Sequence, residues 1–319
     1  NLFNYNASMK SSKFPTEAEI VIVGVGGIVG SMLAYWLAEL GQKNIVGLEK
    51  STVIPSDIAS TAHASDFVYN TTHDKLSNWT TAFSRNFYEE NGFFLKKGGL
   101  EICRKDDDDR WEELKRKVES GKSFGTNVRL ISAAEAKEKF PLLDEESIRG
   151  AMWDPDAGLV IPRSQDVVSF AVESAKEQGA LSTYADTPAV GFEIENGRVT
   201  GVKTDKGIIK TDKVILSSGI WGPLIGDMAG VPVPLAPVEH PLLFFGPLPE
   251  IQETEEFLVY PLLRDQGNSA YVRDTGRLHG GMLEWGFYED KEPRLVDPED
   301  IGNPEKTMTS DSMRHLDLE

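Results

Sequence analysis

The sequence predicts an α/β protein, and three patterns support this prediction. A β-branched run at residues 20–23 precedes a glycine cluster, and an apolar segment of helical length follows at residues 31–40. A second apolar strand at residues 44–48 ends at Glu49. Beyond Gly179 the apolar residues change from helical spacing to the alternation of antiparallel strands. The chain therefore opens with a strand, a helix and a strand, and continues as a mixed arrangement.

Composition excludes several classes of protein. The 319 residues carry 33 Lys and Arg against 51 Asp and Glu, a formal charge of −18, which disfavours nucleic acid as a partner. Hydrophobic residues make up 40% and charged residues 26%, as in soluble globular proteins, and no apolar run is long enough to cross a membrane. The single cysteine, Cys103, excludes an internal disulfide and a cysteine-based zinc cluster, and we predict no metal site.

The elements follow in order along the first half of the chain. Residues 1–16 are polar and predict a loose tail, whereas residues 74–120 predict helices interrupted by a short strand at 98–103. The acidic run at 106–109 is interpreted as a solvated turn. A capping box that begins at Ser132 predicts a short helix ending before Pro141. Another helix is expected from about Ser164 to the stop at Gly179.

The second half predicts mainly strands. Asn196 and Gly197 separate two alternating segments and indicate a tight hairpin. A buried strand is expected at residues 213–216. From Val231 the chain becomes rich in proline, and short strands follow around 242–245, 257–262 and 269–273. We interpret this change in composition as a domain boundary, and a length of about two domains agrees with it.

The glycine cluster at residues 24–30 indicates a dinucleotide site. Glycines between a strand and a helix allow a tight turn, a close approach of backbone N–H groups to a pyrophosphate, and close packing of the helix on the strand. Glu49, at the end of the second strand, would accept hydrogen bonds from ribose hydroxyls, which favours FAD or NAD over a 2′-phosphate. The glycine spacing implies a one-residue insertion relative to the strict motif. A strand-to-helix turn without a ligand is the alternative.

Several motifs together resemble one family of flavoproteins. They are the glycine loop, Glu49-Lys50, the segment Ser60-Thr61-Ala62-His63-Ala64, residues 98–101, residues 130–132 with 141–143, and the Gly219-x-Trp221 turn. In this order, from about residue 18 to about residue 284, they resemble the glycine-oxidase-type FAD-dependent oxidoreductases of the D-amino-acid oxidase superfamily. The match is closest to the branch of dimethylglycine oxidase, dimethylglycine dehydrogenase and sarcosine dehydrogenase.

The resemblance implies a Rossmann-like FAD-binding domain with an inserted mixed-sheet substrate domain. Residues 17–85 and 145–230 would form the FAD-binding domain, and residues 86–144 and 231–319 the substrate domain. The cofactor-binding residues implied are Gly24, Gly26, Gly27, Ile28, Val29, Gly30, Glu49, Lys50, Ser60, Thr61, Ala62, His63, Phe67, Ala189, Gly219 and Trp221.

The resemblance also implies that FAD is attached covalently through His63. In the family, the histidine of the Ser-Thr-x-His-Ala segment is joined to the 8α-methyl group of the flavin. The family usually continues with Pro-Gly or Ala-Gly, where this chain has Ser65-Asp66. A histidine that only forms hydrogen bonds within a loop is the alternative for His63.

Two further positions match the active site of the family. His240 takes the place of a histidine that would hold or accept the substrate amine proton, and Tyr271 takes the place of a tyrosine that would orient the amine. The implied reaction is FAD-dependent oxidative demethylation of a secondary or tertiary N-methyl amine, with hydride transfer to flavin N5. A folate acceptor or an electron-transfer protein would be the partner, and the location would be the cytoplasm, or the mitochondrial matrix in a eukaryote.

Two other functions remain open. After Glu284 nothing resembles the glycine-rich segment and long helix that close the FAD domain in the family. The alternative is therefore a non-catalytic or truncated relative that needs a further segment or a partner chain to complete the flavin site. An NAD-dependent dehydrogenase is less favoured, because the His63 segment would have no role in such an enzyme.

Overall fold

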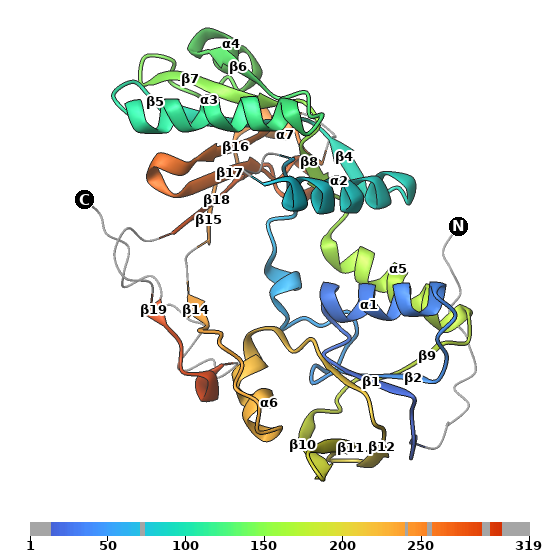
Figure 1. Ribbon diagram of the computed structural model, residues 1–319. Coiled ribbons are helices and arrows are strands. Elements are labelled where there is room, and N and C mark those ends of the chain that lie inside the picture. The colour runs from blue at the N-terminus through green and yellow to red at the C-terminus, as the bar shows by residue number, and fades with distance from the viewer. Residues whose placement is uncertain (1–13, 71–73, 240–241, 254–256, 289–293, 302–319) are drawn as a thin grey trace. The chain divides into compact units, whose positions relative to one another are not determined.

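The structure is a computed structural model that describes residues 14–70, 74–239, 242–253, 257–288 and 294–301 (Figure 1). The chain forms two compact units. Unit 1 contains residues 1–62 and 167–235, and unit 2 contains residues 63–166 and 236–319. Each unit is discontinuous in sequence, because the chain leaves unit 1 after the second strand and returns to it along a helix.

A parallel sheet of four strands forms the centre of unit 1, in the order β13-β1-β2-β9. An antiparallel sheet, β10-β11-β12, packs against one of its faces. The elements of unit 1 are β1 (Ile20–Val23), α1 (Ile28–Glu39), β2 (Ile45–Leu48), α5 (Ser164–Glu177), which begins at the unit boundary, β9 (Leu181–Tyr184), β10 (Ala189–Glu195), β11 (Arg198–Thr204), β12 (Gly207–Lys210), β13 (Val214–Leu216) and α6 (Gly222–Met228).

Alternation along the parallel strands divides the core of unit 1 into two layers. Ile20 and Ile22 of β1 face α1 and α5, whereas Val21 and Val23 face the antiparallel sheet and α6. All four β1 residues are buried because both faces of the sheet are covered. The continuous apolar run at residues 20–23 therefore reflects a central strand, and the strand predicted at these residues is confirmed.

A seven-stranded mixed sheet dominates unit 2, in the order β15-β18-β17-β16-β5-β7-β6, and a three-stranded sheet, β3-β8-β4, lies in the same unit. The strands are β3 (Phe67–Val68), β4 (Phe94–Lys96), β5 (Gly99–Arg104), β6 (Arg129–Ser132), β7 (Ile148–Asp154), β8 (Gly158–Val160), β15 (Leu242–Phe245), β16 (Leu262–Asp265), β17 (Ala270–Asp274) and β18 (Leu283–Phe287), with the pair β14 (Val238–Glu239) and β19 (Arg294–Leu295).

The helices of unit 2 are α2 (Lys75–Glu90), α3 (Asp108–Ser123), α4 (Ala133–Lys139) and α7 (Pro249–Gln252). Leu114 and Val118 of α3 pack on Cys103 and Met152 from one face of the large sheet. Ala136 of α4 contributes to the core on the other face. The N-cap of the predicted capping box is confirmed, because the Glu135 N–H donates to Ser132 Oγ at 3.1 Å, whereas the Glu135 carboxylate pairs with Arg129.

Two details differ from the sequence predictions. Phe14 packs edge-on against Tyr184, with ring centres 5.2 Å apart, so the end of the predicted tail is ordered by apolar packing, while residues 1–13 lie outside the described part. The run at 106–109 is not only a turn: Asp107 caps α3 by accepting from the Arg110 N–H, and Asp108 and Asp109 form its first turn. Acidic residues are stabilised there by the helix dipole.

The unit boundaries also differ from those expected for the domains. Residues 63–85 and 145–166, assigned from the sequence to the FAD-binding domain, pack in unit 2. The reason is strand pairing, because β3 and β4 both pair with β8, and β7 pairs with β5 and β6.

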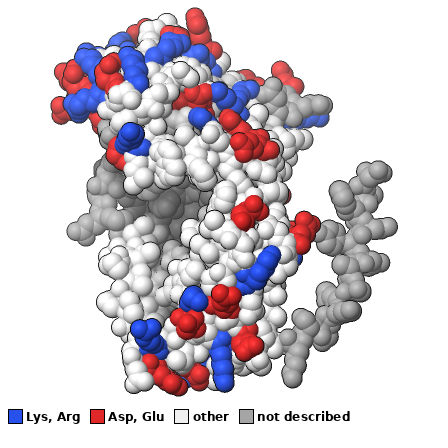
Figure 2. Space-filling view, turned by 45° about the vertical axis from the view of Figure 1, so that its right-hand side comes forward, with Lys and Arg blue, Asp and Glu red and all other residues white. Residues whose placement is uncertain are grey.

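The Asn196-Gly197 hairpin is confirmed, with positive φ angles at both residues. On the face in view in Figure 2, the described acidic and basic side chains are interspersed.

Candidate functional site

The glycine loop of unit 1 is packed too closely for side chains at several positions, and at Gly24 and Gly30 the obstruction is backbone. Gly24 has a φ of +94°, and a Cβ atom there would lie 2.6 Å from the Ser217 carbonyl oxygen. A Cβ atom on Gly30 would lie 2.2 Å from the Gly24 carbonyl oxygen. These glycines let the loop turn sharply and bring α1 against the ends of β1 and β13.

The N-terminus of α1, which follows this loop, lies at a cavity. Gly27 is the N-cap and supplies no side-chain acceptor, so the first-turn N–H groups lack partners within the helix. The Ile28 N–H donates to Thr61 Oγ1 at 3.0 Å, which ties the turn η1 (Ser60–His63) to this helix end. Gly27, Ile28 and Val29 all line the cavity. An anionic group such as a pyrophosphate is favoured at this position.

Glu49 is held in place beside the loop. Its side chain is buried, with Oε2 accepting from the Gly26 N–H and Oε1 from the Ser51 N–H, each at 2.9 Å. A carboxylate has about four acceptor positions, so the two backbone donors leave capacity for ligand hydroxyls. Glu49 lines the cavity at the end of β2, where a ribose is recognised in dinucleotide folds.

The cavity has a volume of about 440 Å³ and lies entirely within unit 1. The Lys50 Nζ atom lies over the Trp221 ring, 4.9 Å from its centre, at one side of the cavity. Much of the remaining wall is apolar and comes from the central strands, from the start of β10 and from α6: Val23, Leu48, Ala189, Val190, Leu224, Ile225 and Met228.

Three polar atoms in this wall are buried without a hydrogen-bond partner within the described residues: Ser56 Oγ, Ser218 Oγ and Trp221 Nε1. Buried polar groups in folded proteins are nearly always satisfied, so these atoms point to a ligand or to water. An apolar wall, a fixed carboxylate and a helix N-terminus fit the adenine, ribose and pyrophosphate of FAD. The residues present therefore fit the cofactor expected from the sequence.

Most of the predicted cofactor residues meet at this cavity. Those that line it are Gly24, Gly27, Ile28, Val29, Glu49, Lys50, Ser60, Thr61, Ala189, Gly219 and Trp221. Gly26 and Gly30 do not line the cavity. The Gly26 N–H donates to Glu49, and Gly30 lets α1 pack against the Gly24 backbone. Ala62, His63 and Phe67 are not in its lining, and His63 is an exposed residue at the end of η1.

Sequence reasoning missed part of the lining. Thr187 and Pro188 precede β10, and Leu224 and Met228 are one helical turn apart on α6. The i, i+4 spacing of Leu224 and Met228 was the available signal, since it places both side chains on one helix face.

The second predicted centre lies in unit 2, around Tyr271 of β17. Its ring covers Gly286 on β18, where a Cβ atom would lie 2.0 Å from the ring carbon Cζ. The ring meets Phe67 edge-on, with centres 5.4 Å apart, and lies 6.3 Å from the Tyr288 ring. Burial raises the pKa of the Tyr271 phenol above its ordinary value of 10, opposed by a side-chain hydrogen bond with Ser65. Phe67 and Tyr271, predicted separately, are therefore in contact.

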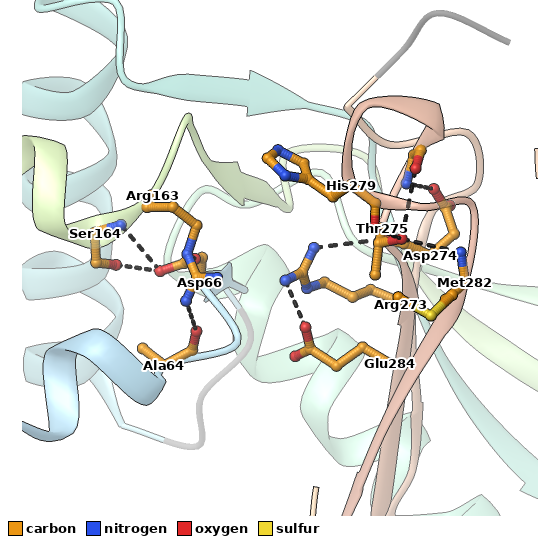
Figure 3. A network of polar contacts seen from close by, with 11 residues as sticks. Ala64, Asp66, Arg163, Ser164, Arg273, Asp274, Thr275, His279, Met282 and Glu284 are labelled. Atoms are coloured by element: carbon orange, nitrogen blue, oxygen red, sulfur yellow. Dashed lines mark hydrogen bonds and ion pairs between the residues drawn. The ribbon is translucent and has the colours of Figure 1, made fainter. Parts of the chain in front are cut away.

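A buried ion pair connects β17, the strand that carries Tyr271, with the neighbouring strand β18 (Figure 3). Arg273 Nη2 and Glu284 Oε2 are 2.5 Å apart, and both side chains are less than a tenth exposed. Glu284 Oε1 and Arg273 Nε have no hydrogen-bond partner within the described residues. The neighbouring Asp274 accepts from the N–H groups of Val259, Tyr260 and Gly276.

His240, the other predicted catalytic residue, lies outside the described residues. Within the described part of the chain, no three His, Cys, Asp or Glu side chains cluster as a metal site. No helix there is long and apolar enough to cross a bilayer.

The fold and the cavity define an α/β protein with a dinucleotide site. A profile of FAD dependent oxidoreductases matches residues 19–310, and the chain belongs to this family. Mitochondrial sarcosine dehydrogenase from human is 29% identical over 88% of the chain, and the mitochondrial pyruvate dehydrogenase phosphatase regulatory subunit from mouse is 29% identical over 90%. The chain spans 30% and 32% of the length of these two relatives.

A solved structure supports the same assignment. L-proline dehydrogenase from P. horikoshii superposes with a TM-score of 0.76 at 30% identity, covering 89% of this chain and 72% of that protein. The α/β fold with a Rossmann-like domain and a mixed-sheet domain, predicted from the sequence, is thereby confirmed.

Proposed function

We propose that this chain forms the FAD-binding and substrate-binding part of an amine oxidoreductase that demethylates a secondary or tertiary N-methyl amine, such as sarcosine or dimethylglycine. The observation that carries the proposal is the cavity of unit 1, where the α1 N-terminus, Glu49 and three unpartnered polar atoms fit a dinucleotide. The printed name of the human relative, sarcosine dehydrogenase, supports an N-methyl amine as the substrate class.

Separate residues of the chain would bind the cofactor and orient the substrate. Glu49 would hold the ribose and the α1 N-terminus the pyrophosphate, while Lys50 and Trp221 border the cavity beside them. Tyr271 would orient the amine as a neutral phenol, because burial keeps its proton bound. His240 would hold or accept the amine proton, since oxidation of a C–N bond requires the free amine lone pair.

Bound FAD would supply the hydride acceptor for oxidation of the N-methyl carbon. Hydrolysis of the resulting iminium by water would release formaldehyde and the demethylated amine, unless the one-carbon unit passed to a folate. We further propose that the His63 imidazole carries the covalent bond to the cofactor. His63 is exposed at the end of η1, whose Ser60 and Thr61 line the cavity. An electron-transfer protein would complete the turnover if dioxygen does not.

Anaerobic reduction of the flavin tests this function. Protein loaded with FAD is mixed with sarcosine, dimethylglycine or L-proline, and the flavin absorbance is recorded. We expect bleaching by an N-methyl amine, followed by one formaldehyde per flavin if no folate is present. His240→Ala should slow the bleaching, whereas His279→Ala, a change at an exposed histidine, should not. A flavin that stays oxidised with each amine contradicts the proposal.

Acid precipitation tests the tether separately. The wild-type precipitate should retain flavin colour, and His63→Ala should release the flavin into the supernatant while still binding it in native buffer. Equal release from both proteins would show that His63 carries no covalent bond.

A second function is favoured by one observation. The mouse relative, as similar as the human dehydrogenase, is named a regulatory subunit of a phosphatase. In this alternative, FAD would be bound in unit 1 without amine oxidation. Retention of FAD together with no bleaching by any amine supports this alternative over the enzyme.

A further inference from the structure

The linker between β9 and β10, residues 185–188, forms part of the cavity wall of unit 1. Thr187 and Pro188 line the cavity, next to Ala189 at the start of β10. Asp186 has a φ of +47°, in the left-handed region, where a residue other than glycine persists only if its surroundings hold it. Because the 185–188 linker belongs to neither helix nor strand, other contacts must fix its position.

Backbone hydrogen bonds join the 185–188 linker to the segment that carries Glu49. The Asp186 N–H donates to the Ser51 carbonyl oxygen at 2.7 Å. The Thr187 N–H donates to the Glu49 carbonyl oxygen at 2.9 Å. The Ser51 N–H in turn donates to the Glu49 carboxylate, which lines the cavity. The linker therefore holds the same stretch of backbone that directs this carboxylate.

The linker is also bonded to Lys206, in the turn between β11 and β12. The Lys206 ammonium donates to the carbonyl oxygens of Ala185 and Asp186, and to Thr187 Oγ1 at 2.9 Å. An ammonium has three N–H groups, so the linker uses its full donor capacity. The buried Thr204 fixes the turn itself, because its hydroxyl accepts from the Lys206 N–H at 3.1 Å.

We propose that Lys206 is a positioning residue for the adenosine half of the cofactor: its ammonium holds the 185–188 linker, and the linker holds Glu49 at the ribose hydroxyls. The inference rests on the proposed function, because that function places the ribose beside Glu49. Lys206 is exposed and does not line the cavity, so it acts through the linker. Without the ammonium, the strained backbone at Asp186 can relax, and the carboxylate loses its fixed direction.

Calorimetric titration of the full chain, prepared without flavin, tests the proposal with two nucleotides. Adenosine diphosphate (ADP) carries both ribose hydroxyls, whereas 2′,3′-dideoxy-ADP lacks both and is otherwise identical. The wild type should bind ADP more tightly, because only ADP can donate to the Glu49 carboxylate. Lys206→Met removes the ammonium and keeps most of the side-chain length. It should reduce the preference for ADP about two- to tenfold, the range of one lost hydrogen bond.

The ratio of the two Kd values separates positioning from a general structural role. A change that only loosens unit 1 weakens both nucleotides alike and leaves the ratio as it is. Glu49→Ala gives the reference value for a lost preference. Lys203→Met, at an exposed position on β11, is the matched control and should keep the wild-type ratio. A wild-type ratio in Lys206→Met overturns the inference.

A second variant covers the case in which Lys206→Met does not fold. Thr187→Val removes the hydroxyl that accepts from Lys206, and should also reduce the preference for ADP. An unchanged ratio in Thr187→Val overturns the inference.

The nucleotide ratio and the amine assay fail separately. If the FAD-loaded wild type oxidises no amine but prefers ADP over the dideoxy nucleotide, the proposed oxidation fails, and the ratio in Lys206→Met still decides the inference. A wild type without this preference overturns the inference, because Glu49 is then not at the ribose.

Discussion

The two predicted centres of this protein are built in different ways. The cavity of unit 1 is formed largely by backbone: glycines, a helix N-terminus and one carboxylate fixed by two N–H groups. The Tyr271 region of unit 2 depends on side chains from distant segments, with ion pairs at Asp66 and Glu284 and ring contacts at Phe67. The first should tolerate changes in most side chains, and the second should not.

The largest effect is expected from breaking the buried ion pair of unit 2. Arg273→Met leaves the Glu284 carboxylate buried and unpaired, which should lower the free energy of unfolding by about 3–5 kcal/mol. Denaturant titration measures it. Lys122→Met removes an exposed pair with Glu119 and should change stability very little. FAD affinity should stay within about threefold for both, because neither residue lines the cavity.

The second-largest effect is expected from adding a side chain to the glycine loop of unit 1. Gly24→Ala combines an unfavourable positive φ with a clash against the Ser217 carbonyl, and should cost about 2–4 kcal/mol with at least tenfold weaker FAD binding. Gly41→Ala is the matched control, because Gly41 also has a positive φ but has open space around it. Equal losses in both variants would show that φ alone, and not the close packing, constrains the loop.

A smaller effect is expected at the ribose position. Glu49→Ala should weaken FAD binding about 10- to 100-fold, the range for hydrogen bonds to a charged group, as measured by calorimetric titration of the apoprotein with FAD. Glu39→Ala, at an exposed position on α1, is the control and should bind FAD normally. Unchanged affinity in Glu49→Ala would remove the carboxylate from the cofactor site.

The smallest effect concerns the charge of Tyr271. Because burial disfavours the phenolate, the folded-state pKa is above 10, and Tyr271 should remain neutral throughout the range in which exposed tyrosines begin to ionise. The midpoint of the difference in ultraviolet titration between the wild type and Tyr271→Phe should therefore lie above pH 10. A midpoint at or below pH 10 would contradict the burial of this phenol.

The same contrast explains how much the sequence could predict. The glycine loop, Glu49 and Trp221 lie in short motifs whose local geometry follows from residue type, so most of the cavity lining was predictable. The contacts of Asp66 with Arg163 and Ser164 were not predictable, because these residues are distant in sequence. Only the pairing of β3 with β8 brings them together. The division of the chain into the two compact units was not predictable either, since it follows strand pairing, which is not visible in local composition.

The most direct test of the account is FAD binding by the wild type, Gly24→Ala and Glu284→Gln, measured side by side by calorimetry on folded protein. The account predicts that the wild type and Glu284→Gln bind FAD with similar Kd values, while Gly24→Ala binds at least tenfold more weakly. No binding by the wild type, or an equal loss in both variants, would contradict the assignment of the cofactor site to the cavity of unit 1.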